Sequence, residues 1–422
     1  MKRTLFSLTA LFLAASLVYA QGTPSPEVLA LLKEDPDRCA VNMHVYEFDP
    51  VSDTRPPKGY KPFYISHYGR HGTRSNESGK EYLYVIERLE KADSLEILTD
   101  EGRSLLEEAR AVNEAYDGRE GRLTPRGERE HRMLAERMYR RFPGVFRNGS
   151  GNVRVQSSKV PRCLVSMASF ISQLAALRPA LKFSIQSDNK IQPLLTDNCT
   201  KEHRAQASKM VRPIYRAPVD TLQLPARIFT DPERGRQLVG GMARFQRRVC
   251  ATAEIARNFD LEFDMFRHLE DDVIYQRFDG CNRHIYLTQC NSEEFGDLRM
   301  PPVAPLVEAI ARQADEAIAS GEVAADLRFG HDWPYMAIVS YLGLEGPGDR
   351  MGFDEIPLRW FGPRYICLAC NLQLIFYRKP GAPVLVKFLV NEKETRLRGL
   401  EAVEGPYYAW ALVREHLDGW RR

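Results

Sequence analysis

The strand-like segments of this chain lie near its two ends, and a long helical stretch separates them. Alternating or β-branched runs occur at residues 60–67 and 152–158, and again from residue 327 onward. Between them, residues 186–321 show mostly amphipathic helical patterns and few strand signals. Strands that alternate with helices indicate an α/β sheet. The sequence therefore predicts an α/β core assembled from both ends of the chain, with a mainly helical unit inserted between them.

The last two strand-like runs favour a mixed sheet. Residues 371–378 (NLQLIFYR) and 382–391 (APVLVKFLVN) are joined by Lys379-Pro380-Gly381, a turn that suits an antiparallel pair. Helical patterns occupy the intervals between strands, and Thr99 and Thr124 stand at positions that predict N-caps. We expect a three-layer core with helices on both faces of the sheet.

The chain is long enough for two structural units, since single cores stop growing near ~250–300 residues. We predict a signal peptide at 1–20, an α/β core made of 21–185 and 322–422, and a helical insertion at 186–321. The insertion is expected to form a lid over the cleft of the core.

The first twenty residues have the layout of a secretory signal peptide. Lys2 and Arg3 precede a mostly apolar run from Leu5 to Val18, and small residues follow near Ala20. That run is short for a spanning helix, and no other stretch is apolar enough to cross a bilayer. We expect an exported protein that keeps no integral membrane segment after cleavage, whether periplasmic, on the cell surface or secreted. The sequence gives no indication of the oligomeric state.

The overall charge offers no argument for nucleic acid as a partner. The formal net charge is +3, and removal of Lys2 and Arg3 with the signal peptide leaves +1. Any anion binding must therefore come from a local cluster of basic residues.

The chain contains eight cysteines, and an even number in an exported protein favours disulfide bonds. Many connectivities are open, with Cys281 and Cys290 a plausible local pair. Cys367 and Cys370 have the spacing of half a zinc site, but no second such pair occurs, so zinc is not favoured.

A cluster of basic residues follows the first strand-like segment. RHGTR (70–74) places Arg70, His71 and Arg74 within five residues. The two guanidinium groups repel a protonated imidazole, so the arrangement does little for folding, but it suits the binding of a dianion beside a histidine. Neutral imidazole is a competent nucleophile toward phosphorus, and an arginine fork meets two phosphate oxygens at once. The tripeptide RHG alone would be read as a surface loop.

Two further strand ends carry residues of matching chemistry. Arg162 follows the segment 152–158, and His331 and Asp332 follow the strand-like run at 327–331. Ligands gather at the carboxyl ends of strands in α/β sheets. The three strand ends are therefore expected to assemble one pocket.

These motifs resemble those of the histidine phosphatase superfamily, in the branch of histidine acid phosphatases and phytases. RHGTR matches the signature RHGxR, and the His-Asp pair at 331–332 matches the proton-donor signature. Further segments resemble multiple inositol-polyphosphate phosphatases: GRLTPRG (121–127), SSKVPRC (157–163), LLTDNC (194–199) and NLQLIFYR (371–378).

The resemblance implies a phosphoglycerate mutase-like core and a role for each residue of the motifs. His71 would be the nucleophile, and Asp332 the general acid and base. The phosphoryl oxygens would be bound by Arg70, Arg74, Arg162 and His331. The substrates would be small-molecule phosphate esters, and no metal or other cofactor is required. Because His71 must be unprotonated and Asp332 protonated, we expect an acidic to near-neutral pH optimum.

One departure keeps the substrate open. Inositol-polyphosphate phosphatases of this kind usually carry His-Ala-Glu where this chain has His331-Asp332-Trp333. Asp332 can still act as general acid and base, but the sequence does not decide whether the substrates are inositol phosphates such as phytate or a broad range of esters. One alternative lies within the superfamily, a phosphotransferase of the phosphoglycerate mutase type. Two come from other classes, a phosphate-ester binding protein without turnover and a structural or adhesion module.

The other residues near the motifs are interpreted as structural. His67 is expected to pack, Trp333 and Tyr335 to belong to the core, and Glu77 and Glu81 to be solvated charges. Lys201, His203 and Arg204 begin the helical insertion, where an ordinary charged turn is favoured over contacts with further phosphates.

Overall fold

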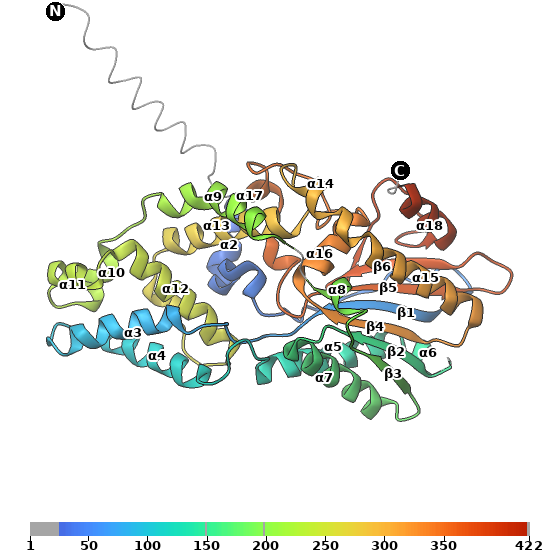
Figure 1. Ribbon diagram of the computed structural model, residues 1–422, viewed down its shortest axis with the longest axis horizontal. Helices are drawn as coiled ribbons and strands as arrows, with labels where there is room; N and C mark the ends of the chain where they lie inside the picture. The colour runs from blue at the N-terminus through green and yellow to red at the C-terminus, as the bar shows by residue number, and fades with distance from the viewer. Residues whose placement is uncertain (1–24, 148–149, 197–198, 420–422) are drawn as a thin grey trace, which may run out of the picture.

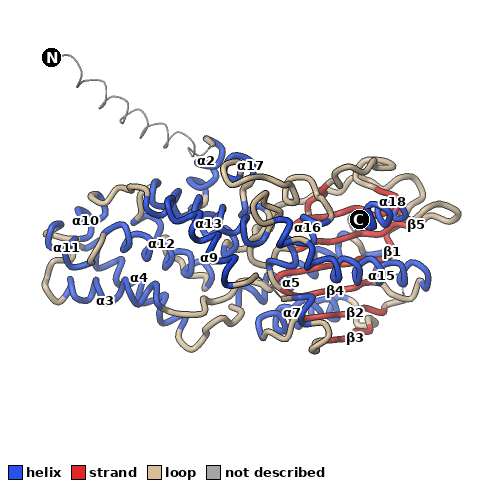
Figure 2. The backbone as a smooth tube through the Cα atoms, turned by 45° about the horizontal axis from the view of Figure 1, so that its top comes forward, coloured by secondary structure: helices blue, strands red, loops and turns tan. Residues whose placement is uncertain are grey.

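The structure is a computed structural model that describes residues 25–147, 150–196 and 199–419. The signal peptide expected at 1–20 lies outside the described residues. All the strands gather at one end of the molecule, and the other end is built from helices (Figures 1 and 2).

One mixed sheet forms the core of the strand-containing end. Its strands run in the order β3-β2-β4-β1-β5-β6-β7, with β8 beside β6. Their bounds are β1 Lys61–Arg70, β2 Asn152–Ser157, β3 Lys182–Gln186, β4 Ala325–Gly330, β5 Asn371–Arg378, β6 Leu385–Val390, β7 Lys393–Thr395 and β8 Tyr408–Ala409. The first four strands pair in parallel, and β5 and β6 form the antiparallel hairpin that the sequence predicted. Strands β1 and β4 are neighbours although most of the chain lies between them, so both ends of the chain build the core, as predicted.

Helices cover both faces of this sheet (Figure 1). One face carries α5 (Pro125–Arg141), α6 (Pro143–Arg147) and α7 (Pro161–Leu177), and the other carries α15 (Ala304–Ser320), α16 (Asp332–Tyr341) and α18 (Trp410–Gly419). Successive strand residues point to opposite faces. Thus His67 of β1 meets Phe170 of α7, with ring centroids 5.3 Å apart, while Phe376 of β5 meets Trp410 of α18 at 4.9 Å. The predicted three-layer α/β core is confirmed.

The helical end combines segments from two parts of the chain. It contains α3 (Lys80–Asp93), α4 (Asp100–Tyr116), α9 (Lys201–Arg216), α10 (Gln223–Ile228), α11 (Pro232–Val239), α12 (Met242–Asn258) and α13 (Asp271–Gln289). Thr99 caps α4 and Thr124 caps α5, each accepting a hydrogen bond from a backbone amide three residues on, as predicted. The described residues between 186 and 325 hold no strand of the sheet. The domain boundaries and the lid stay predictions.

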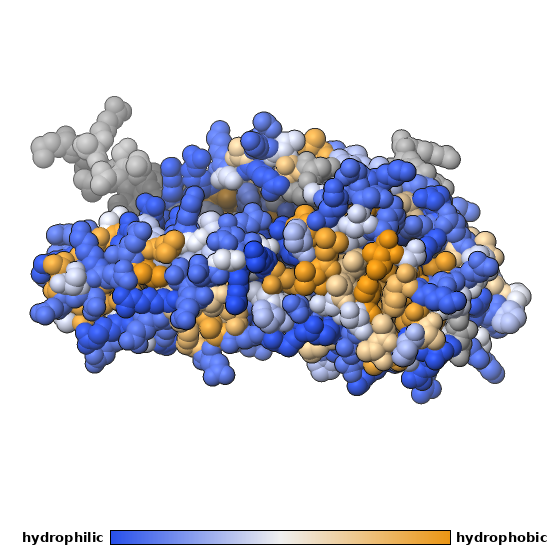
Figure 3. Space-filling view, turned by 60° about the horizontal axis from the view of Figure 1, so that its bottom comes forward, coloured by the Kyte–Doolittle hydropathy of each residue, from blue (hydrophilic) through white to orange (hydrophobic). Residues whose placement is uncertain are grey.

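The remaining elements are short. They are α2 Pro26–Glu34, η2 Pro36–Met43, α8 Gln192–Leu195, η3 Met265–His268, α14 Gly296–Arg299, η4 Pro301–Val303, α17 Ile356–Arg359 and η5 Gly362–Arg364. In the part of the chain that the structure covers, no helix has both the length and the hydrophobicity needed to cross a bilayer. The face in Figure 3 is mostly hydrophilic, with apolar side chains in separate patches.

The suggested pairing of Cys281 with Cys290 is wrong. Cys281 lies inside α13, and Cys290 directly follows the last residue of that helix. At about 1.5 Å per residue the helix holds the two Cα atoms about 13 Å apart, whereas a disulfide needs about 4.4–6.8 Å. Both Cys281 and Cys290 are free thiols in this structure.

Candidate active site

The carboxyl ends of β1, β2 and β4 meet at one edge of the sheet. In the parallel ladders Arg70 stands opposite Gly330, and Ser157 stands opposite Phe329. The backbone pairing of β1 with β4 continues one residue past the end of β1, where the amide of His71 donates a hydrogen bond to the carbonyl oxygen of Gly330 at 3.0 Å. The loops that carry the predicted site residues therefore lie side by side, as the sequence predicted.

His71 is held in one orientation by its own loop. Its side chain is buried, and its Nδ1 lies 3.0 Å from the carbonyl oxygen of Gly72. A carbonyl oxygen can only accept, so Nδ1 carries the proton of the neutral ring and Nε2 has a free lone pair. Gly72 has no room for a side chain, since a Cβ there would lie 2.6 Å from the carbonyl oxygen of Gly127.

The surroundings of His71 keep it neutral. Burial lowers the pKa of His71 well below its ordinary value, and the positive charges of Arg70, Arg74 and Arg162 lower it further. The ring lies edge-on to His331, with centroids 5.6 Å apart. An unprotonated imidazole is the form that can attack an electrophile.

Arg70 is fixed by the protein but keeps donors for a ligand. Its Nη1 donates to the carbonyls of Ile366 and Cys367 at 3.0 and 3.2 Å, and its Nη2 lies 3.1 Å from the Asp332 carboxylate. Carbonyl oxygens orient the guanidinium without neutralising its charge. Its buried Nε makes no hydrogen bond to any described residue.

Arg74 and Arg162 follow the same pattern. Arg74 donates to the carbonyl of Ser75 at 2.8 Å, and Arg162 lies 3.6 Å from the exposed carboxylate of Glu77. The Nε atoms of both are buried and have no hydrogen-bond partner among the residues described. Burial and the neighbouring Arg162 and Arg70 lower the pKa of Arg74 to about 10. Crowded cations with unused donors make a site for a compact anion such as a phosphoryl group.

Asp332 is the first residue of α16 and lies against Arg70. Burial alone would raise its pKa, but the charge of Arg70 and a hydrogen bond from Asn42 Nδ2, 3.0 Å away, outweigh burial and lower the pKa to about 2. The carboxylate is therefore ionised in the unliganded site. Burial lowers the pKa of His331 to about 4, and its Nε2 lies 3.3 Å from Ser158 Oγ and 3.7 Å from Cys163 Sγ.

Sequence reasoning missed Asn42. It belongs to η2, whose Val41 has non-helical backbone angles (φ 50°, ψ −98°), and it reaches a residue 290 positions away. The carbonyl of Asn42 also accepts from Arg70 Nη1. Nothing in the local pattern of residues 36–43 marks this asparagine, since neither periodicity nor a motif includes it.

The structure confirms the sequence-based interpretation of some residues near the motifs and differs for others. His67 packs between Phe170 and Phe329, and Trp333 and Tyr335 are core residues with 2% and 0% exposure, all as interpreted. Glu77 is exposed, as interpreted, although it lies near Arg162. The interpretation of Glu81 as merely solvated is wrong, because it is only partly exposed and pairs with Arg248. At the start of α9, His203 is buried against Phe295, whereas Lys201 and Arg204 are exposed.

A family model identifies the family of the chain. The model of the histidine phosphatase superfamily (branch 2) matches residues 69–292, just over half of the chain. The chain belongs to this family. It is an enzyme of the histidine acid phosphatase type. The matched residues include the RHGTR motif and Arg162, while His331 and Asp332 lie beyond them.

Solved structures of similar fold include other phosphatases. The multiple inositol polyphosphate phosphatase of Bifidobacterium longum in its apo form has a TM-score of 0.72 and 17% identity, covering 90% of this chain and 97% of that one. The phytase of D. castellii has a TM-score of 0.71 and 13% identity, covering 91% and 85%. The apo phytase of Hafnia alvei has a TM-score of 0.51 and 14% identity, covering 87% and 98%. No curated protein matches this chain in sequence.

Proposed function

We propose that this histidine phosphatase is an exported phosphomonoesterase that works through a phosphohistidine on His71. The observation that carries the proposal is the neutral His71, with Nε2 free, among three arginines with unused buried donors. Arg70, Arg74, Arg162 and His331 bind the phosphoryl oxygens. Phosphoryl transfer depends mainly on such positioning and charge neutralisation.

In the first step His71 Nε2 attacks phosphorus, and the bond from phosphorus to the ester oxygen breaks. The leaving oxygen takes a proton from Asp332. In the second step Asp332 takes a proton from water, the resulting oxygen attacks phosphorus, and the bond to Nε2 breaks. Inorganic phosphate leaves, and both side chains return to their starting protonation states.

The low pKa of Asp332 fits this cycle when the charge of the substrate is included. The charge of Arg70 keeps the carboxylate ionised. A bound phosphate offsets the arginine charges and repels the carboxylate, and both effects raise its pKa. A substrate that binds as a monoanion therefore brings the proton that Asp332 later donates.

Inositol phosphates are the first substrate class to consider. The structurally similar Bifidobacterium longum enzyme has been solved with inositol hexasulfate and with phosphate, and the Hafnia alvei phytase with myo-inositol hexakis sulphate. These ligands belong to those proteins, and the low identities leave the preference of this chain to experiment.

A cavity next to the arginines favours a second candidate, an acid phosphatase of broad specificity with little phytate activity. This cavity of about 550 Å³ is lined by Arg162 and Arg122 together with three carboxylates, Glu77, Glu120 and Glu128. A wall with more carboxylates than guanidinium groups repels additional phosphates. Esters with one phosphate avoid this repulsion.

The test is phosphate release by the purified protein from p-nitrophenyl phosphate and from phytate, between pH 3 and 8 with EDTA present. We expect release that EDTA spares and that His71→Ala abolishes. The ratio of the two rates distinguishes the two candidates. Absence of release from both esters would overturn the phosphatase proposal and favour tight binding of phosphate esters without turnover. Sequencing the N-terminus of the exported protein tests cleavage near Gln21.

A further inference from the structure

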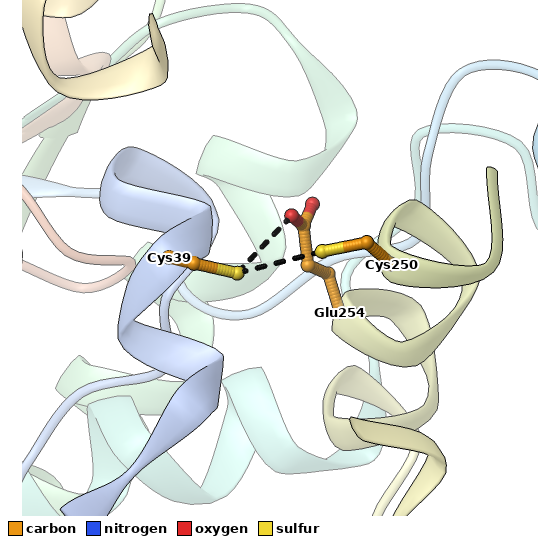
Figure 4. Close-up of side chains that lie close together, drawn as sticks. All are labelled: Cys39, Cys250 and Glu254. Atoms are coloured by element: carbon orange, nitrogen blue, oxygen red, sulfur yellow. Dashed lines mark hydrogen bonds between the residues drawn. The ribbon is translucent and has the colours of Figure 1, made fainter. Parts of the chain in front are cut away.

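Two buried thiols lie where η2 packs against α12 of the helical end. Cys39 lies in η2 and Cys250 in α12, and 211 positions of sequence separate them. Both side chains are fully buried, and their sulfur atoms are 3.7 Å apart. Figure 4 shows the two sulfurs directed toward one another, with Glu254 beside them.

We propose that Cys39 and Cys250 form a disulfide bond in the mature, exported protein. The bond is about 2.05 Å long, so the sulfurs must approach by roughly 1.6 Å, a movement within the reach of rotation about the two Cα–Cβ bonds. The oxidant is a disulfide of the thiol-exchange class that exporting compartments supply. Each thiol gives up one proton and one electron, the S–S bond forms, and the oxidant leaves as a dithiol. The inference rests on export and is independent of the phosphatase chemistry.

A metal ion is the competing occupant of this cluster, because Cys39, Cys250 and Glu254 offer three donor atoms close together. However, both oxygens of Glu254 already accept from Arg277, at 2.6 and 2.9 Å. A cation bound there would face a guanidinium group. A structural zinc site also needs four ligands, preferably thiolates or imidazoles. The geometry therefore favours a bond between the two sulfurs.

Burial of the two thiols also limits the stage of folding at which the disulfide can form. Desolvation raises the pKa of the Cys39 thiol well above its ordinary value, with Cys250 beside it adding to the effect. A thiol that stays protonated reacts slowly in exchange. The disulfide must therefore form while α12 packs onto η2, and once formed it is shielded from reductants.

The bond would secure a segment that the active site uses. Asn42, three residues after Cys39 in η2, donates to Asp332 and accepts from Arg70. Fixing Cys39 to α12 therefore anchors the segment that orients the acid–base carboxylate. The loop that it closes spans half of the chain, and long loops gain most from a cross-link.

The first test is peptide mapping without reduction, on protein collected after export and denatured in N-ethylmaleimide. We expect a cross-linked peptide pair containing Cys39 and Cys250, which separates after reduction. Finding both cysteines labelled by the reagent would overturn the proposal. Cys281, whose sulfur lies 3.8 Å from the carbonyl oxygen of Ala40, is an alternative partner. A disulfide from Cys281 to either cysteine would also overturn the proposal.

The second test measures thermal stability. Protein that is reduced in denaturant and refolded with its thiols kept reduced should have a Tm about 2–6 °C below that of the native protein. The double variant Cys39→Ala/Cys250→Ala should show no further change on reduction, and the control Cys281→Ala should respond like the native protein. Elemental analysis is made of the native protein and of the double variant. Stoichiometric zinc in the native protein that is absent from the double variant would show a metal site in place of the disulfide and overturn the proposal.

Discussion

Asp332→Asn removes the carboxylate proposed as the general acid while keeping its shape. The asparagine can still accept from Asn42, whose Nδ2 lies 3.0 Å from the Asp332 carboxylate, but it cannot give a proton to the leaving oxygen. General acid–base catalysis contributes about 10²–10⁴-fold to such reactions. We expect kcat for an alkyl ester such as glycerol phosphate to fall by that factor.

The same substitution should tighten the binding of phosphate. Asp332 is ionised in the empty site and lies 3.1 Å from Arg70, so it offsets charge that a phosphate would use. A unit charge about 5 Å from the phosphate is worth roughly 3 kcal/mol at an effective dielectric constant of about 20. The side chain is 16% exposed, so solvent screens part of this interaction. Inorganic phosphate should therefore inhibit the variant about tenfold more strongly.

Rapid mixing separates the two chemical steps. With p-nitrophenyl phosphate, a good leaving group, Asp332→Asn should retain a fast burst of nitrophenol and then turn over slowly, because water is no longer activated. With the alkyl ester no burst should occur. The reasoning is refuted if the burst slows equally for both esters, or if steady turnover of the alkyl ester stays within about threefold of the native rate.

Four shorter predictions concern the neighbours of the site. Asn42→Ala should raise the pKa of Asp332 by about one unit, since a hydrogen bond to a charged group is worth about 1.5–3 kcal/mol. The shift is read from the alkaline limb of the pH–rate profile. A limb that stays at the same pH would leave Asn42 without a positioning role. Because the pKa of His71 is far below normal, kcat/KM should not decline as pH falls through 6.5, and a decline there would show an unperturbed imidazole. The double variant Glu77→Gln/Glu120→Gln should increase kcat/KM for phytate about tenfold more than it increases kcat/KM for p-nitrophenyl phosphate. Equal increases for the two esters would show that charge repulsion is not the basis of selectivity. Burial lowers the pKa of His67 to about 3, so its neutral form stabilises the fold above pH 6.5, and this stability is lost as the pH falls toward 3. The native protein should therefore lose unfolding free energy between pH 7 and pH 5. His67→Leu should reduce that loss by roughly 2 kcal/mol, measured by urea unfolding.

The parts of the fold that the sequence predicted rest on local signals. The strand before RHGTR, the threonine caps of α4 and α5, and the hairpin of β5 and β6 each follow from residues that are neighbours in sequence. The strand-like runs before them placed Arg162, His331 and Asp332 after strand ends, and the parallel pairing of β1, β2 and β4 brings these ends together.

What the sequence could not predict depends on contacts between distant residues. The hydrogen bond from Asn42 to Asp332 joins positions 290 apart, and the contact of Cys39 with Cys250 joins positions 211 apart. The error over Cys281 and Cys290 has the same origin, because closeness in sequence becomes a separation of many ångströms when a helix lies between. Glu81 was misjudged since its partner, Arg248, lies on another helix.

The site shows how a protein keeps several arginines close together. Arg70 is held by backbone carbonyls, which carry only partial negative charge, and shares a single carboxylate, Asp332, with Asn42. Full neutralisation by further carboxylates would stabilise the empty state more, but a phosphate would then have to displace them. Because carbonyl dipoles and one carboxylate that can accept a proton hold Arg70 instead, its guanidinium group stays oriented and charged before the substrate arrives. In the mechanism proposed above, that preorganisation, rather than the number of arginines, makes a neutral His71 beside them useful for phosphoryl transfer.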